Sequence, residues 1–370
     1  MKISVVMGTR PGIVKMAPVY LALREIDEFE VSIIYTGQHY SSNMKDDIVS
    51  AFDLPAPVFT IDGLEGCKTH GAQISRMMVG CEDYFISEKP SVVLVCGDAN
   101  TNLAAGIAAR KTDRVLCHVE SGLRSRDWSM PEEHNRVMLD HISNFLFAPT
   151  AESAKNLAKE SVSGEVFVVG NTVVDSLKFA IDKNILSKPD AIDLVPKDYI
   201  LLTAHRQENV DDPQKLRSIL EAARLLVSSG LKIVFPVHPR TAKMIAQFGL
   251  SEMIDPRIKV IDPVPYENML WLILNASLVM TDSGGLQEEA CVLGTPCVTL
   301  RENTERPESV DVGANIIAGV NASRILSAVE QFSARGPAHS WHSPFGNGNS
   351  GELIAEIIYE KYCSPSNSLR

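Results

Sequence analysis

The feature that most constrains this chain is an alternation between short β-branched runs and longer segments of helical period. Strands are predicted at Ile3–Met7, Val31–Tyr35, Val92–Cys96, Val115–Val119 and Val166–Val169. Helices are predicted between them at Pro11–Leu23, Thr101–Ala109, Pro131–His141 and Ala151–Lys159. Short, evenly apolar strands that alternate with helices are typical of a parallel sheet covered on both faces. The first half of the chain is therefore predicted to be a doubly wound α/β domain.

The alternation stops in a polar, proline-containing stretch near residues 182–196 and then restarts. Further strands are predicted at Tyr199–Thr203, Lys232–Phe235, near Val260, Leu278–Thr281 and Cys297–Leu300, with helices at Gln214–Ser228 and Leu286–Leu293. A chain of 370 residues is long enough for two domains. We therefore expect two doubly wound Rossmann-like α/β domains facing a cleft, where ligands of such folds bind.

The expected boundaries are residues 1–180 for the N-terminal domain and 181–350 for the C-terminal domain. A last segment of helical period, Gly351–Tyr362, carries Leu353, Ile354, Ile357 and Ile358 on one stripe. We expect a helix over residues 351–363 that packs back on the first domain.

Charge and cysteine content narrow the class of protein. The formal net charge is −11 and the isoelectric point is near 5.4, whereas a nucleic-acid binder of this size usually carries a basic surplus. No apolar run approaches the ~20 residues of a membrane helix. The seven cysteines are spread out without a CxxC pair, which indicates buried free thiols in a reducing compartment. The expectation is a soluble cytoplasmic protein with no nucleic-acid or membrane partner.

The clearest candidate phosphate site is the turn Ser283-Gly284-Gly285, which joins a predicted strand to a predicted helix. Two glycines allow close backbone approach, and the free N–H groups of a helix N-terminus favour an anion. An ordinary βα turn with Ser283 as the N-cap explains the pattern equally well. Glu289 could accept hydrogen bonds from a ribose diol, whereas Glu288 equally fits a solvated helix face.

A second glycine loop, Gly8–Gly12, follows the first predicted strand. Arg10 and Lys15 are expected to project toward the cleft, where both suit a diphosphate. A single lysine on a first helix is more often solvated, so Lys15 alone is a weak signal.

Four ionisable residues follow predicted strands or open a predicted helix: Asp98, Glu120, Glu132 and His205. In an open parallel sheet, reacting groups collect at the carboxyl ends of the strands. Each residue alone is better explained as a cap, a dipole partner or an ion pair with Arg124 or Arg136. Four such groups facing one cleft instead favour acid/base chemistry. No HExxH, DxD or cysteine cluster predicts a metal site.

These residues lie within twelve ordered fragments that together resemble the non-hydrolysing UDP-N-acetylglucosamine 2-epimerases over nearly the whole length. The fragments are Gly8–Pro18, Thr36–Ser41, Gly97–Ala104, His118–Ser125, Pro131–Arg136, Phe147–Thr150, Gly170–Asp175, His205–Asn209, Val237–Pro239, Thr281–Ala290, Thr304–Glu308 and Pro344–Gly351. The resemblance implies the glycosyltransferase-B architecture, with a C-terminal helix that returns to the first domain. It also implies a homodimer.

The activity implied by the resemblance is interconversion of UDP-GlcNAc and UDP-ManNAc without NAD or metal. UDP leaves by anti elimination to give a 2-acetamidoglucal, and is then added back. By the same resemblance, Asp98, Glu120 and Glu132 match catalytic acids, and Glu289 matches a ribose-binding glutamate. Arg10 and His238 match nucleotide-side residues. Departure of the diphosphate would be assisted by Arg10, Lys15, His205, Ser283 and the helix beginning at Gly284 and Gly285.

Several alternatives remain open. Related epimerases that act on UDP-2,3-diacetamido-uronic acids share nearly all of these fragments, and a hydrolysing epimerase would release ManNAc. A glycosyltransferase of the same architecture needs only one base, so three carboxylates favour the epimerase. A nucleotide-sugar sensor without turnover is a fourth possibility, since many relatives carry an acidic residue where this chain has Gly12.

Overall fold

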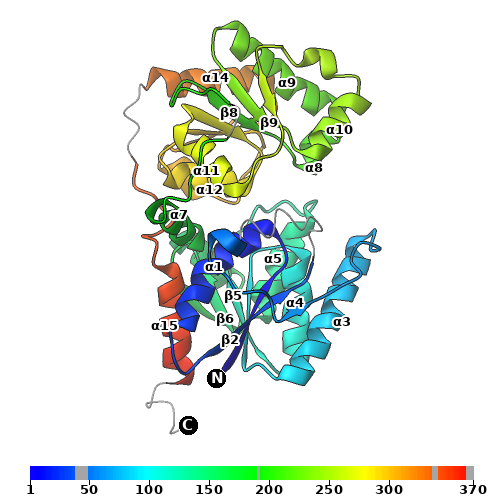
Figure 1. The fold of residues 1–370 in the computed structure, drawn as a ribbon, viewed down its shortest axis with the longest axis vertical. Helices are drawn as coiled ribbons and strands as arrows, with labels where there is room; N and C mark the ends of the chain where they lie inside the picture. The colour runs from blue at the N-terminus through cyan, green and yellow to red at the C-terminus, as the bar shows by residue number, and fades with distance from the viewer. Residues whose placement is uncertain (38–48, 190–191, 336–340, 364–370) are drawn as a thin grey trace. The chain divides into compact units, whose positions relative to one another are not determined.

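The computed structural model describes residues 1–37, 49–189, 192–335 and 341–363. It contains two compact α/β units (Figure 1). Unit 1 comprises Met1–Asp182 and the segment from Phe345 onward, and unit 2 comprises Lys183–Pro344. Each unit is built on one sheet whose paired strands are all parallel. The predicted α/β class with two parallel sheets is confirmed.

The sheet of unit 1 has the order β3-β2-β1-β4-β5-β6-β7. Its strands are β1 (Lys2–Met7), β2 (Glu30–Tyr35), β3 (Phe59–Thr60), β4 (Val92–Cys96), β5 (Val115–Val119), β6 (Phe145–Ala148) and β7 (Glu165–Val168). Strand order reverses between β1 and β4, which pair through Val5 and Leu94. Ligands of doubly wound sheets bind at the carboxyl ends of such a pair. The loops after β1 and β4 therefore mark the binding edge of this unit.

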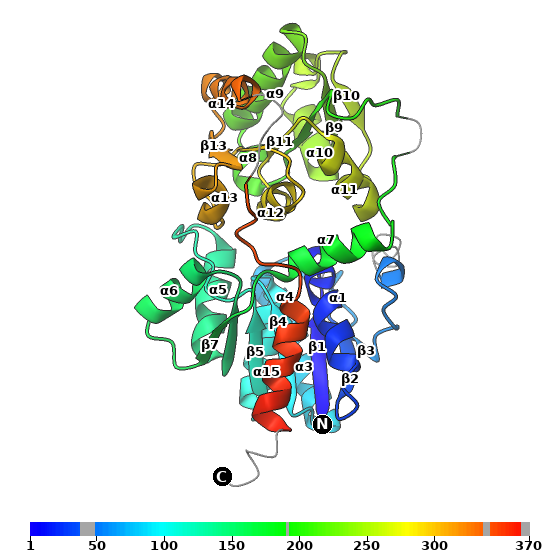
Figure 2. The same ribbon diagram turned by 90° about the vertical axis from the view of Figure 1, so that its left-hand side faces the viewer.

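Two groups of helices cover this sheet. Its helices are α1 (Arg10–Arg24), α3 (His70–Glu88), α4 (Asn100–Lys111), α5 (Pro131–Ile142), α6 (Ala151–Lys159), α7 (Thr172–Asp182) and α15 (Ser350–Tyr362). Helix α4 packs against both α3 and α5, whereas α1 packs against α7 and α15. Helices α1 and α15 lie side by side in both views (Figures 1 and 2). The C-terminal helix is thus part of unit 1.

Polar contacts fix the start of α15 to α7. The backbone N–H of Gly351 donates to Asp175 Oδ1 at 2.8 Å, so a carboxylate of α7 caps the N-terminus of α15. The N–H of Asn171 donates to the carbonyl of Phe345 at 2.8 Å. Because Asp175 is buried, desolvation raises its pKa, and the hydrogen bond from Gly351 opposes that shift.

The sheet of unit 2 has the order β10-β9-β8-β11-β12-β13. Its strands are β8 (Ile200–Thr203), β9 (Ile233–Pro236), β10 (Lys259–Ile261), β11 (Leu278–Thr281), β12 (Cys297–Thr299) and β13 (Asn315–Ile317). Here the order reverses between β8 and β11, which are in register from Leu278 with Ile200 to Thr281 with Thr203. The loops after these two strands mark the binding edge of unit 2.

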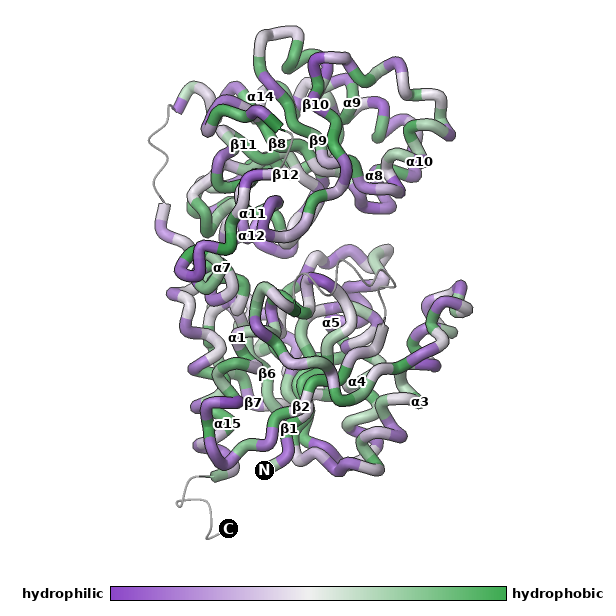
Figure 3. Tube along the Cα trace, viewed as in Figure 1, coloured by the Kyte–Doolittle hydropathy of each residue, from purple (hydrophilic) through white to green (hydrophobic). Residues whose placement is uncertain are grey.

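Helices α9 and α14 pack together in unit 2, as do α11 and α12. The helices of this unit are α8 (Gln207–Val210), α9 (Pro213–Ser228), α10 (Pro239–Gln247), α11 (Tyr266–Asn275), α12 (Gly284–Val292), α13 (Pro307–Asp311) and α14 (Ala322–Ala334). Figure 3 shows hydrophobic residues along β1 and β2 of unit 1 and along β8 and β9 of unit 2. Such runs are expected of strands that are buried on both faces.

All seven cysteines are free, and five of them are buried. No helix in the described ranges combines the length and the apolar character needed to cross a lipid bilayer.

Candidate active site

Asp98 and Glu120 emerge from neighbouring strands of unit 1. Cys96, the last residue of β4, is in register with Val119, the last residue of β5. A Cβ atom built on Gly97 would lie 2.9 Å from Glu120 Oε2, so the Glu120 carboxylate occupies the space that a side chain at Gly97 would need. Gly97 has a φ of 76°, which also favours glycine. The structure therefore brings these two predicted carboxylates to one point of the sheet edge.

Glu120 forms a buried ion pair with Lys15 of α1, and both side chains are nearly inaccessible to solvent. The sequence predicted that Lys15 binds a diphosphate. The structure pairs its ammonium group with a carboxylate that follows the end of β5. A buried carboxylate needs such a counter-charge to remain ionised.

Asp98 forms an ion pair with the guanidinium of Arg136, on α5. The Asn135 side-chain amide donates to the Asp98 carbonyl at 2.8 Å, which holds the loop after β4 against α5. The Asp98 side chain is 36% exposed, whereas that of Arg136 is 3% exposed. The carboxylate thus remains accessible while its cationic partner is buried.

The adjacent residues Glu132 and Glu133 of α5 differ in environment. Glu132 lies in the first turn of α5 and is half-buried. Glu133 is buried and accepts from the backbone of Ser125 at 3.0 Å and of Arg126 at 2.8 Å. Burial tends to raise the pKa of Glu133, but these hydrogen bonds and Arg136 outweigh it and hold the pKa below its usual value. Glu133 therefore acts as a structural anion, and Glu132 is the more accessible of the two.

The first glycine loop sits at the switch point of unit 1. A Cβ atom on Gly8 would lie 2.2 Å from the hydroxyls of Thr36 and Thr101, so only glycine fits there. The Thr9 hydroxyl accepts from the N–H of Gly12 at 3.2 Å and caps α1. Arg10 is the first residue of α1 and is half-buried. This geometry places Arg10 at a helix N-terminus beside the end of β1.

In unit 2 the loop after β8 is held by one carboxylate. Asp282 has no exposed surface. It accepts from the backbone N–H of His205 at 3.0 Å and of Arg206 at 2.9 Å, and from the Asn209 amide at 3.2 Å. Burial lowers the pKa of His205, a shift that the negative charge of Asp282 opposes. The net lowering of this pKa favours the neutral imidazole.

The predicted residues His205 and His238 lie close together, with ring centroids 5.7 Å apart. His238 is the N-cap of α10, and its Nδ1 accepts from the N–H of Arg240 at 3.2 Å. Since Nδ1 is an acceptor, a proton on the neutral ring is carried by Nε2. Unit 2 thus offers two imidazoles at its binding edge.

Ser283, Gly284 and Gly285 form the turn into α12. Ser283 is the N-cap, and its Oγ accepts from the N–H of Leu286 at 3.4 Å. The hydroxyl proton can still be donated to a ligand. Glu289, one turn further on, is 7% exposed. The ordinary capping role is present, and it is compatible with an anion at the free N–H groups of this helix.

Sequence reasoning missed a buried charge network beneath this turn. Arg306 Nε donates to Glu288 Oε1 at 2.8 Å, and Glu288 has no exposed surface. The alternative of a solvated helix face for Glu288 is therefore wrong. A Cβ on Gly284 would lie 3.1 Å from Arg306 Nη1, so the guanidinium packs directly against the glycine. The arginine in Thr304–Glu308 was the available signal, but its partner on another element was not visible in the sequence.

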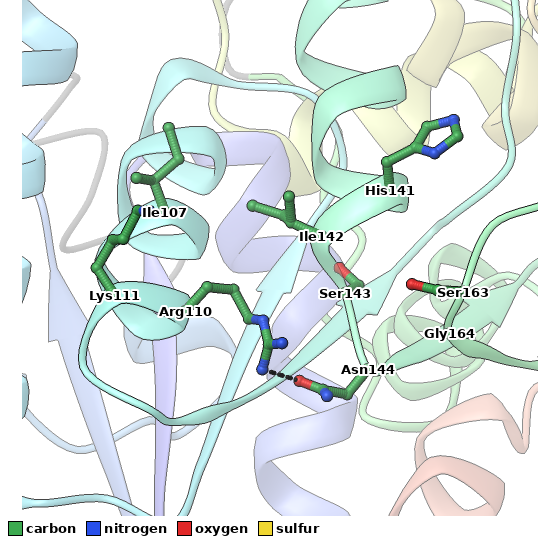
Figure 4. Close-up of a pocket in the computed structure, with 9 residues that line it drawn as sticks. All are labelled: Ile107, Arg110, Lys111, His141, Ile142, Ser143, Asn144, Ser163 and Gly164. Carbon is green, nitrogen blue, oxygen red and sulfur yellow. Dashed lines mark hydrogen bonds between the residues drawn. The ribbon is translucent and has the colours of Figure 1, made fainter.

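Unit 1 has a cavity of about 430 Å³ that is separate from the residues described above (Figure 4). It is lined by Ile107, Arg110, Lys111, His141, Ile142, Ser143, Asn144, Ser163 and Gly164. These residues belong to the C-terminal halves of α4 and α5 and to the segments just before β6 and β7, so the cavity lies at the amino ends of the strands. It is therefore not part of the candidate site at Asp98 and Glu120.

Some predicted features lie outside the described residues. They are Gln38–Ser41 of the second fragment and residues 190–191 of the polar stretch near residues 182–196. Within the described ranges, no three His, Cys, Asp or Glu side chains are grouped as a metal-ligand set.

The two parallel sheets define a class of protein, namely proteins with two Rossmann-like domains. A plant glycosyltransferase, Phytolacca americana UGT2, shares the fold at 12% identity, with a TM-score of 0.60 over 97% of this chain and 99% of that one. This likeness concerns the fold alone.

The family follows from closer matches. Residues 21–359 match the model of the family described as UDP-N-acetylglucosamine 2-epimerase, and the chain belongs to that family. A Methanocaldococcus jannaschii relative named UDP-N-acetylglucosamine 2-epimerase is 45% identical over 98% of this chain and 100% of its own. A crystal structure of the M. jannaschii enzyme in complex with UDP-GlcNAc and UDP has a TM-score of 0.87 over 97% of this chain and 99% of that one, at 43% identity.

A second activity occurs among the relatives. A Pseudomonas aeruginosa protein named UDP-2,3-diacetamido-2,3-dideoxy-D-glucuronate 2-epimerase is 37% identical over 97% of this chain and 99% of its own.

Proposed function

We propose that the protein is an isomerase that interconverts UDP-GlcNAc and UDP-ManNAc. The 45% identity to a UDP-N-acetylglucosamine 2-epimerase over almost the whole chain supports this substrate. The main structural support for this chemistry is that Asp98 and Glu120 follow the ends of adjacent strands. Each carboxylate forms an ion pair with its own buried cation. Two carboxylates, each with its charge neutralised by a different cation, provide two acid/base groups. A proton exchange on opposite faces of one carbon requires two such groups.

The reaction is an anti elimination followed by re-addition. A carboxylate takes the C2 proton while the C1–O bond breaks, and the bonding electrons of C1–O leave with UDP. UDP then attacks C1 of the acetamidoglucal, and a second acid delivers a proton to the other face of C2. Because the C2 proton is weakly acidic, stabilisation of the departing diphosphate is the main electrostatic task.

We propose that the catalytic acids and bases are Asp98, Glu120 and Glu132. The diphosphate is bound by Arg10, by His205, and by Ser283 with the amides of Gly284 and Gly285. Glu289 binds the ribose and His238 the nucleotide. Lys15 balances the charge of Glu120, and its predicted contact with the diphosphate stays a prediction.

The lowered pKa of His205 suits this assignment. A neutral imidazole can donate a hydrogen bond to the leaving diphosphate or carry a proton. We also propose a homodimer and a cytoplasmic location, the former testable by light scattering after gel filtration.

Product analysis by NMR tests the activity. Purified protein incubated with UDP-GlcNAc is expected to give a stable mixture with UDP-ManNAc. Free ManNAc as the main product would instead show a hydrolysing enzyme, and no turnover with tight UDP-GlcNAc binding would show a sensor. The 37% identity to the diacetamido-glucuronate epimerase makes that uronate the matched second substrate. We expect kcat/KM to favour UDP-GlcNAc, and a preference for the uronate would reassign the substrate.

A further inference from the structure

His118 is a buried histidine that connects three elements of unit 1. It is the next-to-last residue of β5 and has no exposed surface. Its Nδ1 lies 2.7 Å from Oδ1 of Asp140, on α5. Its Nε2 lies 3.1 Å from the carbonyl of Gly97, in the loop after β4. One ring therefore joins the ends of β4 and β5 to the helix that carries Glu132.

Both ring nitrogens face acceptors, a carboxylate on one side and a carbonyl on the other. A neutral imidazole donates from only one nitrogen and would present a lone pair to the other acceptor. The doubly protonated ring satisfies both. This state also balances the local charge, since Asp140 Oδ2 accepts from Arg124 at 2.7 Å and Arg124 binds Glu160 at 2.7 Å. Two cations and two anions then form one neutral cluster, of which only Glu160 is partly exposed.

Asp140 shows the effect of these contacts. Its burial would raise its pKa, but the hydrogen bond and charge of His118, together with Arg124, lower it below the usual value. The same carboxylate accepts from the N–H of Gly122 at 3.1 Å, two residues after Glu120. Asp140 thus holds the backbone that follows one proposed catalytic carboxylate. His118 holds the backbone that precedes the other, Asp98.

We propose that His118, with both ring nitrogens protonated, is a positioning residue that fixes the spacing of Asp98 and Glu120. This inference rests on the proposed epimerase function. The contact to Gly97 matters most, because Gly97 lies next to Asp98 and its Cα faces the Glu120 carboxylate. A shift of this loop changes the distance from each carboxylate to the same carbon atom, and misplacement by about 1 Å can reduce a rate about 100-fold.

Two substitutions separate the two contacts of the ring. His118→Asn keeps an N–H donor near the Nδ1 position, facing Asp140, and loses the donor to Gly97. His118→Gln keeps a donor near the Nε2 position, facing Gly97, and loses the one to Asp140. Both remove the positive charge equally. The matched control is His342→Gln, an exposed histidine of unit 2 outside this cluster, which is expected to leave kcat unchanged.

Positioning predicts a split between kcat and KM. With UDP-GlcNAc, His118→Asn is expected to lower kcat about 100-fold with KM within about threefold, and His118→Gln to retain at least about ten times the kcat of His118→Asn. His118→Asn is also expected to release a larger share of its turnovers as free UDP and acetamidoglucal, because a displaced acid delivers the second proton too slowly. Equal losses of kcat in both variants, or losses that follow the melting temperature alone, would overturn the proposal.

The protonation state is tested in the unmodified protein. In a sample labelled with 15N-histidine at pH 7.5, NMR is expected to show one imidazole with protons on both nitrogens, and His118→Gln to remove that signal. A single-proton signal for His118 would overturn the charged state. Absence of turnover in the wild-type protein would count against the proposed function, whereas the NMR result does not depend on it.

Discussion

Glu120 adopts a backbone conformation that residues with side chains rarely occupy. Its φ is 67°, in the left-handed region, at a cost of about 1–2 kcal/mol. The conformation turns the chain at the end of β5 and directs the carboxylate toward Gly97 and Lys15. Strain of this kind persists where surrounding contacts impose it, and here those contacts are an ion pair and a glycine.

Neutral replacements of the three carboxylates are expected to affect turnover rather than binding. Asp98→Asn, Glu120→Gln and Glu132→Gln should each lower kcat by about 10²–10⁴-fold, the usual contribution of a general acid or base. Calorimetric Kd values for UDP should stay within about threefold, since the proposed UDP contacts lie mainly on unit 2.

Glu152→Gln is the matched control for these variants. It makes the same change on α6, where Glu152 pairs with Lys155 on the surface. Its kcat should equal that of the wild type. Carboxylate variants that weaken UDP binding while keeping kcat would contradict the assignment.

Ser283 has a capping role and a proposed binding role, and substitutions can separate them. Glycine is nearly as good an N-cap as serine, whereas alanine loses about 1 kcal/mol. Ser283→Gly should therefore melt near the wild-type temperature but bind UDP about 10- to 100-fold more weakly, the loss expected for a hydrogen bond to a charged group. Ser283→Thr, which keeps the hydroxyl, should bind UDP normally. Unchanged affinity in Ser283→Gly would remove Ser283 from the diphosphate site.

At the scale of elements, the anchoring of α15 on α7 depends on a buried carboxylate. Desolvation raises the pKa of Asp175 in the folded state, so folding takes up protons and stability increases as pH falls through that pKa. Above it, the charged group lowers stability. Asp175→Asn keeps the acceptor for Gly351 and removes the charge.

Asp175→Asn is therefore expected to melt at a higher temperature than the wild type at pH 7.5, with the difference disappearing near pH 4. Asp175→Ala also lacks the cap and should be about 1 kcal/mol less stable than Asp175→Asn at both pH values. Thermal unfolding followed by circular dichroism at the two pH values measures this. A wild type more stable than Asp175→Asn at pH 7.5 would show that the charge at the helix N-terminus outweighs its desolvation.

Elements with strong local patterns could be predicted well from the sequence. Strand β5 was predicted at its observed bounds, and α9 was predicted from Gln214 and begins at Pro213. Such patterns are local, because side chains alternate in a strand and repeat every 3.6 residues in a helix. The very short β3 (Phe59–Thr60) carries too few residues to show a period, and it was not predicted.

The site could be predicted only in part. Residues at strand ends were predictable because parallel strands bring their carboxyl ends together. Contacts between side chains on different elements could not be predicted. The contacts of Lys15 with Glu120 and of Arg306 with Glu288 join elements whose spacing depends on packing. Asp282 shows the same limit, since its role in holding the His205 backbone depends on β8 and β11 being neighbours.

At the scale of the whole molecule, we propose that UDP contacts lie mainly on unit 2 and the catalytic carboxylates on unit 1. This assignment predicts two patterns of amide protection. UDP alone should slow hydrogen exchange around residues 204–209 and 282–289 of unit 2 and around the unit 1 loop that carries Arg10. UDP-GlcNAc should also protect residues 97–99 and 119–122 of unit 1, because only the sugar reaches the carboxylates. Exchange measured by mass spectrometry resolves these peptides. Protection of residues 97–99 and 119–122 by UDP alone would contradict this assignment.

The central claim is that a carboxylate removes the C2 proton of a UDP-2-acetamido sugar and that a proton from solvent replaces it. NMR of UDP-GlcNAc incubated with the protein in heavy water tests this directly. The account predicts UDP-ManNAc that carries deuterium at C2, followed by deuterium at C2 of the remaining UDP-GlcNAc. Conversion to UDP-ManNAc with the original hydrogen retained at C2 would contradict it.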